Sequence, residues 1–101
     1  MNLGTAIKTV RKERGLGQKD LADRCGLSVN ALSQIEINAS FPHKTTIEKI
    51  AEALQVPVSY LLFFSISEED IPEEKRKVFN TLNGAIKDIL IDTIAAKTGN
   101  Q

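Results

Sequence analysis

Apolar residues recur three and four positions apart over much of the chain, a spacing that places them on one face of an α-helix. The first segment with this spacing has the apolar residues Leu3, Ala6, Ile7 and Val10. Two glycines, Gly15 and Gly17, end this helix and open the next. The pattern therefore predicts a chain that begins with an amphipathic helix.

Two short helices are predicted next, over about residues 18–25 and 29–36. Their inward positions are Leu21, Ala22, Cys25, Leu32 and Ile35. Gly26 follows the first of them, where glycine can supply the left-handed conformation of a tight turn, and Ser28 suits the N-cap of the second. Helices this short are not stable alone. The pair, separated only by Gly26 and Leu27, has the outline of a helix-turn-helix.

A fourth and a fifth helix are predicted between residues 45 and 64. Thr45, followed three residues later by Glu48, matches a capping box. The apolar stripe behind it consists of Ile47, Ile50, Ala51 and Leu54. Proline is tolerated in a first helical turn, so Pro57 can open a short fifth helix that ends near residue 64. The inward residues of this helix are Tyr60, Leu61 and Phe64.

The last predicted helix, from about residue 73 to residue 96, follows an acidic boundary at residues 68–70. The boundary divides the chain into a domain of residues 1–66 and a C-terminal segment of residues 67–101. The apolar positions of the helix are Val78, Phe79, Leu82, Ile86, Ile89, Leu90 and Ile94. Because one side of a lone helix cannot bury this much apolar surface, we expect it to form a homodimer across a two-fold axis, alone or with the fifth helix. The alternative is that it folds back on the first domain as an extra core helix.

The composition is that of one small globular domain. The chain has 101 residues, of which 42% are hydrophobic and 26% are charged. The formal net charge is zero, but residues 1–44 carry seven basic and four acidic side chains, which leaves +3 there and −3 in the remainder. This asymmetry allows a basic contact surface on the N-terminal part.

The single cysteine, Cys25, excludes an intrachain disulfide and a thiolate metal site, and we expect it to behave as a small buried apolar residue. No apolar run is long enough for a membrane span, and the N-terminus lacks the features of a secretory signal. We therefore expect a cytoplasmic protein. With one histidine, no glycine-rich phosphate loop and no evident carboxylate pair, the sequence gives no support for an enzyme, a cofactor, a metal or a small-molecule ligand.

Residues 18–36, with the sequence QKDLADRCGLSVNALSQIE, resemble the DNA-binding family of phage Cro and repressor proteins. The resemblance extends from about Leu3 to Phe64. It implies an all-α fold of five helices, here followed by the longer C-terminal helix, and double-stranded DNA as the partner. Two residues depart from the family's pattern, because Asn38 stands where glycine is usual and Pro57 where serine or threonine is usual. Asparagine is the next residue best suited to a left-handed turn.

The outward face of the helix over residues 29–36 carries no charge. It consists of Val29, Asn30, Ser33 and Gln34. Asparagine and glutamine make bidentate hydrogen bonds to adenine in the major groove, serine contacts several base edges, and valine packs against the thymine methyl group. We therefore expect these side chains to contact bases. The resemblance places Val29, Asn30 and Gln34 at base edges.

Phosphate contacts are expected from groups that flank this face. Candidate anion sites are Gln18 with the free N–H groups at its helix start, Ser28 at the next helix start, and the loop N–H groups near Asn38. Lys44, just before the predicted capping box, is expected to join them.

Two charged residues fall on apolar helix faces. Arg11 lies four positions after Ile7, and Glu36 lies four positions after Leu32. In the family that the chain resembles, an arginine late in the first helix pairs with a glutamate that ends the third. We therefore expect an ion pair between Arg11 and Glu36, which would fix the third helix against the first.

These features predict a sequence-specific transcriptional regulator that binds an operator as a dimer. The sequence also fits two alternatives. One is the antitoxin of a two-component module, whose C-terminal segment would block a toxin. The other is a protein-interaction module that keeps the five-helix fold without binding DNA, which the zero net charge favours.

Overall fold

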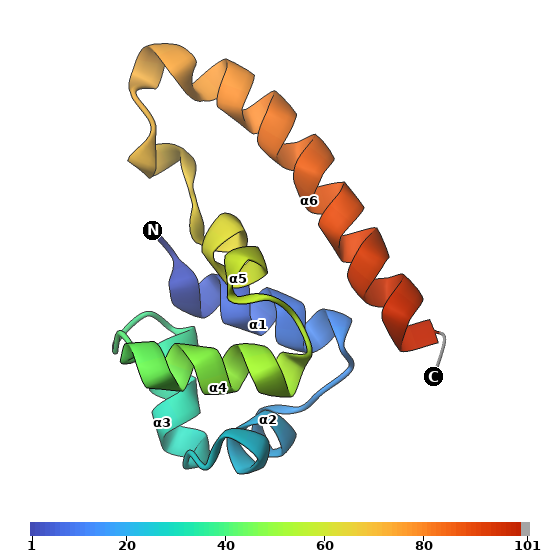
Figure 1. The fold of residues 1–101 in the computed structure, drawn as a ribbon. Coiled ribbons are helices and arrows are strands. Elements are labelled where there is room, and N and C mark those ends of the chain that lie inside the picture. Colours follow the sequence, from blue (N-terminus) through green and yellow to red (C-terminus); the bar gives the residue numbers. More distant parts are fainter. Residues whose placement is uncertain (100–101) are drawn as a thin grey trace.

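The structure is a computed structural model that describes residues 1–99, and their side chains as far as residue 96. Regular structure in these residues is entirely helical (Figure 1). The α-helices are α1 (Leu3–Glu13), α2 (Gln18–Cys25), α3 (Val29–Glu36), α4 (Lys44–Leu54), α5 (Val58–Ser65) and α6 (Arg76–Gly99), and 3₁₀ turns span Glu68–Asp70 and Glu73–Lys75. The predicted order of five short helices and one longer C-terminal helix is confirmed.

The centre of the fold is α1, which packs against α3, α4, α5 and α6. Its apolar stripe is fully buried, and the core continues through residues from each of the other α-helices. These core residues are Leu21, Ala22, Cys25, Leu32, Ile35, Ile50, Ala51, Leu54, Leu61, Phe64 and Ile94. Figure 1 shows α6 running beside this bundle and approaching it at its C-terminal end.

The tight turn between α2 and α3 forms as the sequence predicts. Gly26 adopts a left-handed conformation with φ of 70°. The Ser28 hydroxyl oxygen accepts a hydrogen bond from the Ala31 N–H at 3.0 Å and so caps α3. Because both signals act within a few residues, the two helices begin and end where the sequence places them.

The start of α4 differs from the prediction. The helix begins at Lys44, and His43 is its N-cap. An N-cap residue needs a non-helical backbone, and His43 has the extended backbone that this position requires. Thr45 and Glu48 therefore lie inside the helix, and the predicted capping box between them does not form.

The fifth helix begins one residue later than predicted. Pro57 has an extended backbone and stands at the N-cap, so Val58 is the first helical residue. Leu61 and Phe64 are buried as predicted, whereas Tyr60 is half-buried against the core. Proline at this cap does not prevent the helix from forming.

Arg14 joins the end of α1 to two other helices. Its guanidinium donates to the carbonyl oxygens of Leu54 and Gln55, each at 2.7 Å. A third hydrogen bond reaches the Ile94 carbonyl oxygen of α6 at 3.3 Å. The first two carbonyls lie at the C-terminus of α4, where the helix dipole favours a positive charge. Arg14 thus holds the C-terminal part of α6 against the first five helices.

One part of α6 packs on the bundle and another part does not. Ile94 is only 1% exposed, and Leu90 and Ile91 lie half-buried against the core. Leu90 and Ile94, which the sequence assigned to a dimer surface, therefore face the protein's own core. The other residues of that predicted surface are the half-buried Phe79 and the exposed Val78, Leu82, Ile86 and Ile89.

Candidate nucleic-acid interface

The outward face of α3 is an uncharged polar surface. Asn30 and Gln34 are exposed, as is Val29, and Ser33 is half-buried at its edge. The opposite face of the same helix is anchored in the core by apolar residues. The two amide side chains therefore project away from the protein, with hydrogen-bond donors and acceptors of the kind that read adenine.

The end of α3 is fixed to α1 by a buried ion pair. The Arg11 guanidinium donates from Nε to Glu36 Oε2 at 2.7 Å and from Nη2 to Glu36 Oε1 at 3.0 Å. The side chains are 9% and 1% exposed. Arg11 Nη1 also donates to the Leu16 carbonyl oxygen at 2.8 Å. This paired geometry restricts the rotation of α3 about its own axis, and so sets which side chains face outward.

Gln18 contacts this ion pair, a role that the sequence pattern does not predict. Its side-chain amide donates from Nε2 to Glu36 Oε1 at 3.0 Å, which ties the start of α2 to the end of α3. The side chain was expected at a phosphate, but part of its donor capacity is used here. The pairing joins residues on different helices, and no spacing rule in the sequence could have found it.

The helix starts differ in the groups that they offer to an anion. Gly17, the N-cap of α2, has no side chain, so no side-chain cap covers the N–H groups of the first turn of α2. Asp20 adds a negative charge to this turn, which opposes anion binding. Ser28 caps α3 with its oxygen, and its hydroxyl hydrogen is free to donate outward. Lys44 is exposed in the first turn of α4.

The loop after α3 does not offer the free N–H groups that were predicted to bind a phosphate. The N–H groups of Asn38, Ala39 and Ser40 all donate to carbonyl oxygens of α3. They are turned back because Asn38 has a left-handed backbone with φ of 62°. Asn38 therefore closes the end of α3, and the geometry does not support a phosphate site at this loop.

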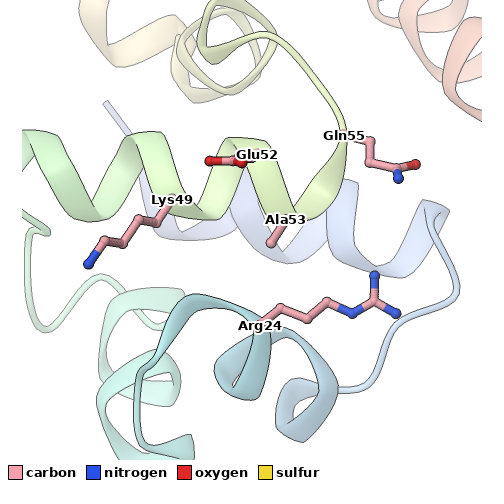
Figure 2. A pocket seen from close by; sticks show the side chains of 5 residues that line it. All are labelled: Arg24, Lys49, Glu52, Ala53 and Gln55. Atoms are coloured by element: carbon pink, nitrogen blue, oxygen red, sulfur yellow. The ribbon is translucent and has the colours of Figure 1, made fainter.

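A hollow of about 360 Å³ lies between α2 and the C-terminal half of α4 (Figure 2). Its lining residues are Arg24, Lys49, Glu52, Ala53 and Gln55. In Figure 2 the charged ends of Arg24 and Lys49 point in opposite directions, and the Glu52 carboxylate adds a negative charge. The two positive charges therefore do not converge on one point, as they would at an anion site.

Cys25 is buried beside this hollow as a small core residue. Its Sγ lies 3.8 Å from the Lys49 carbonyl oxygen. Burial raises the pKa of the thiol, and the nearby Lys49 charge opposes this only in part. The thiol therefore stays protonated at neutral pH, which makes it a poor nucleophile. Within residues 1–99 the structure also holds no cluster of metal-binding side chains, and no helix there could span a membrane.

The sequence is similar to those of known proteins. Residues 7–61 match the model of the helix-turn-helix family. The immunity repressor protein of Bacillus phage phi105 is 36% identical over 81 residues, which cover 80% of this chain and 54% of the repressor. The HTH-type transcriptional regulator SutR of Escherichia coli (strain K12) is 44% identical over 57 residues, 56% of this chain and 32% of SutR. The HTH-type transcriptional regulator SinR of Bacillus licheniformis is 29% identical over 96 residues, 94% of this chain and 83% of SinR.

The chain spans about half the length of the first of these relatives and about a third of the second. All three names describe repressors or transcriptional regulators rather than enzymes. The matched residues include all of α2, α3 and α4, and therefore the outward face of α3.

Proposed function

Because the chain belongs to the helix-turn-helix family, we propose that it is a sequence-specific DNA-binding regulator of transcription that reads an operator through α3. The observation that carries this proposal is the exposed amide face of α3, held in one orientation by the buried pair between Arg11 and Glu36. A helix of this kind fits the major groove, where base edges differ in their donors and acceptors. Binding to cellular DNA would place the protein in the cytoplasm.

In this proposal Asn30 and Gln34 hydrogen-bond to base edges, and Val29 packs against a thymine methyl group. Ser33, at the half-buried edge of the face, reaches a base or an adjacent sugar. The side chains carry no charge, so they contribute specificity rather than general attraction to DNA. Their exposure leaves them free to meet a groove without rearrangement of the core.

Phosphates on either side of the groove would be held by the flanking groups. Lys44 supplies a positive charge at the start of α4, and Ser28 a hydroxyl donor at the start of α3. Gln18 would contribute mainly its backbone N–H, since its side chain already bonds to Glu36. Asn38 is not part of this set, because its N–H and side chain bond within the protein.

We also propose that the regulator binds as a homodimer through the exposed stripe of α6. This stripe consists of the exposed Val78, Leu82, Ile86 and Ile89, with the half-buried Phe79 at its edge. A row of exposed apolar side chains on one helix is typical of an interaction surface. A two-fold dimer presents two reading helices about 34 Å apart, which is one turn of DNA.

Selection of bound sequences from a random duplex pool tests the proposal directly. We expect enrichment of a site with two inverted half-sites, because a two-fold dimer reads a palindrome. A salt titration with one selected duplex should give an affinity that falls with salt at a log–log slope of about −0.9 per neutralised phosphate. Without enrichment and without salt-dependent binding, the interaction module favoured by the zero net charge would be the better reading.

A further inference from the structure

An exposed isoleucine continues the outward face of α3 beyond the last residue of the helix. Ile37 is the C-cap of α3, and its N–H donates to the Ser33 carbonyl oxygen at 3.1 Å, as it would inside a helix. Ile37 lies seven residues after Asn30 and three after Gln34, so the helical repeat places all three side chains on one side of α3. The face proposed to read bases therefore extends over two turns and ends in an apolar side chain.

The side chain of Ile37 lies outside the core, and it is 63% exposed. Isolated apolar side chains are common on protein surfaces and need no explanation by themselves. Ile37 differs from these by its place, because the rest of this face carries the hydrogen-bonding groups of Asn30, Ser33 and Gln34. A surface that meets the edges of bases would cover this isoleucine as well.

Both chain neighbours of Ile37 are fixed to α1. Glu36 is held by the buried ion pair at the end of α3. Asn38 Oδ1 accepts a hydrogen bond from the Gly4 N–H at 2.9 Å, and Asn38 Nδ2 donates to Thr5 Oγ1 at 3.1 Å. The backbone of Ile37 is thus held on both sides, and the branched Cβ of isoleucine restricts rotation of its side chain. A contact made by Ile37 therefore costs little conformational entropy.

The base edges of the major groove offer one apolar group of this kind, the C5-methyl group of thymine. The other groups displayed there are hydrogen-bond donors and acceptors. A polar edge placed against Ile37 would lose water without gaining a hydrogen bond, which is unfavourable. The thymine methyl group instead gains from removal of apolar surface from water. The chemistry of the side chain therefore favours a T·A pair at the base that it faces.

We propose that Ile37 is a specificity-determining residue, which reads the C5-methyl group of a thymine in the major groove. This rests on the DNA binding proposed above, and it adds a residue and the chemical group that the residue contacts. The thymine differs from the one assigned to Val29. Val29 and Ile37 are eight residues apart, which is about 12 Å along the helix, whereas successive base pairs are only about 3.4 Å apart. The two apolar side chains thus read different thymines, with the amides of α3 between them.

Phe41 is also exposed and apolar, but it does not continue this face. It follows the left-handed turn at Asn38, which ends the helical repeat. Its side chain instead borders an apolar groove between α4 and α5. Phe41 is 69% exposed, close to the value for Ile37, so it provides a matched control.

The test is a double-mutant cycle between the protein and the selected operator. Each thymine of the operator is replaced in turn by deoxyuridine, which removes the C5-methyl group and keeps the base pair. The parent protein should bind one of these duplexes about fourfold more weakly, the factor expected for one buried methyl-sized group. With Ile37→Ala the same replacement should weaken binding by less than about twofold, because the methyl group has already lost its partner. Fluorescence anisotropy measures each affinity.

Three further variants make this result specific to Ile37. Ile37→Val keeps a branched side chain and should retain part of the sensitivity to the methyl group. Val29→Ala should remove the sensitivity at a different thymine and leave that of the Ile37 thymine intact. Phe41→Ala should leave the sensitivity at every thymine unchanged. Circular dichroism confirms that each variant is folded, as expected for substitutions of exposed side chains.

Two outcomes would overturn the proposal. One is a loss of affinity with Ile37→Ala by the same factor on all duplexes, which would assign Ile37 to the sugar–phosphate backbone. The other is an operator in which no thymine methyl group is coupled to Ile37. Operator enrichment and salt-dependent binding of the parent protein are measured first. A protein that meets both criteria without coupling at Ile37 refutes this inference alone, whereas a protein that binds no DNA refutes the proposed function as well.

Discussion

Asn38 and Gly4 close the contact between the end of α3 and the start of α1. The Gly4 N–H donates to Asn38 Oδ1 at 2.9 Å, and Asn38 Nδ2 donates to Thr5 Oγ1 at 3.1 Å. Gly4 is buried so close to α3 that a Cβ there would overlap the Ile35 carbonyl oxygen. The absence of a side chain at Gly4 therefore allows α1 to support the end of the proposed reading helix.

Gly4→Ala should destabilise the fold by about 2–3 kcal/mol, because the added methyl group meets backbone atoms that cannot move aside easily. Urea unfolding of the two proteins, followed by circular dichroism, measures the difference. Gly84→Ala is the matched control, since Gly84 is exposed in α6 and its added Cβ meets nothing within 4 Å. There alanine should stabilise the helix, by up to about 1 kcal/mol. A similar effect at both positions would show that the approach of α1 to α3 is not tight.

Signals that act within a few residues allowed much of the fold to be predicted from the sequence. The bounds of α2 and α3 follow from Gly26, Ser28 and the apolar spacing around them. The left-handed turn at Asn38 follows from the tolerance of asparagine for that conformation. The N-cap of α4 lies at His43, two residues before the Thr45 of the predicted capping box, because threonine and glutamate at capping-box spacing can equally lie within a helix.

Contacts between distant parts of the chain could not be predicted in the same way. Arg14 bonds to carbonyl oxygens 40 and 80 residues away, and any exposed arginine would look the same in the sequence. Ile94 belongs to the core, although its spacing along α6 matches that of the exposed residues.

The outward face of α3 was predictable because helical periodicity fixes it. The loop at Asn38 was not, since the direction of its N–H groups depends on the turn geometry.

The ion pair at the end of α3 should contribute more to the free energy of unfolding than an exposed charge does. Glu36→Gln leaves the Arg11 guanidinium buried without its counter-charge, which should cost about 3–5 kcal/mol. The melting temperature should fall accordingly, and a thermal scan measures it. Glu13→Gln is the control, because Glu13 is exposed on α1 and should cost under about 1 kcal/mol. Equal and small effects would mean that the buried pair adds little to stability.

Arg14 should secure α6 to the rest of the fold. Arg14→Met keeps most of the side-chain volume but removes the hydrogen bonds to α4 and α6, at a cost of about 2 kcal/mol. Hydrogen exchange should accelerate more in the C-terminal part of α6 than in α2. Arg24→Met, an exposed arginine on α2, serves as the control. Uniform acceleration along the chain would show that Arg14 supports the whole core rather than the attachment of α6.

Acid should remove a contribution that Asp70 makes to the stability of the fold. The pKa of this carboxyl is held below its ordinary value, chiefly because the Ser67 N–H donates to it, and also because the N-terminal ammonium lies 2.9 Å away. A lowered pKa in the folded state adds stability above the ordinary aspartate pKa, and that stability is lost as pH falls through the lowered pKa. Asp70→Ala should therefore have a lower melting temperature than the parent protein at neutral pH. The difference in melting temperature should disappear in strong acid.

The control for this pH dependence is Glu69→Gln, an exposed neighbour of the same charge type. This variant retains Asp70 and its hydrogen bonds, so it should lose stability on acidification as the parent protein does, and its difference from the parent should stay small at every pH. Thermal unfolding of all three proteins across the acid range gives the comparison. A difference between Asp70→Ala and the parent that persisted unchanged in strong acid would assign the effect to packing instead of charge.

Substitutions on α3 and at the start of α4 should affect DNA binding in different ways. Asn30→Ala or Gln34→Ala should cost about 1–3 kcal/mol on the selected operator and relax the preference at one base position per half-site. Binding to random duplex should change little, because these side chains carry no charge. Lys44→Ala should weaken both kinds of binding similarly and reduce the salt slope by about 0.9, since one phosphate contact is lost. Fluorescence anisotropy over a range of salt measures both effects.

Lys8→Ala is the control for Lys44→Ala, because Lys8 is an exposed lysine of α1 that is not among the proposed groove contacts. It should change the association rate at low salt more than the affinity, as a charge that only steers the approach would. A drop in operator and random-duplex affinity by the same factor with Asn30→Ala would mean that this face does not read bases. The exposed amides of α3 would then be a solvated surface, and specificity would have to come from the shape of the DNA or from another element.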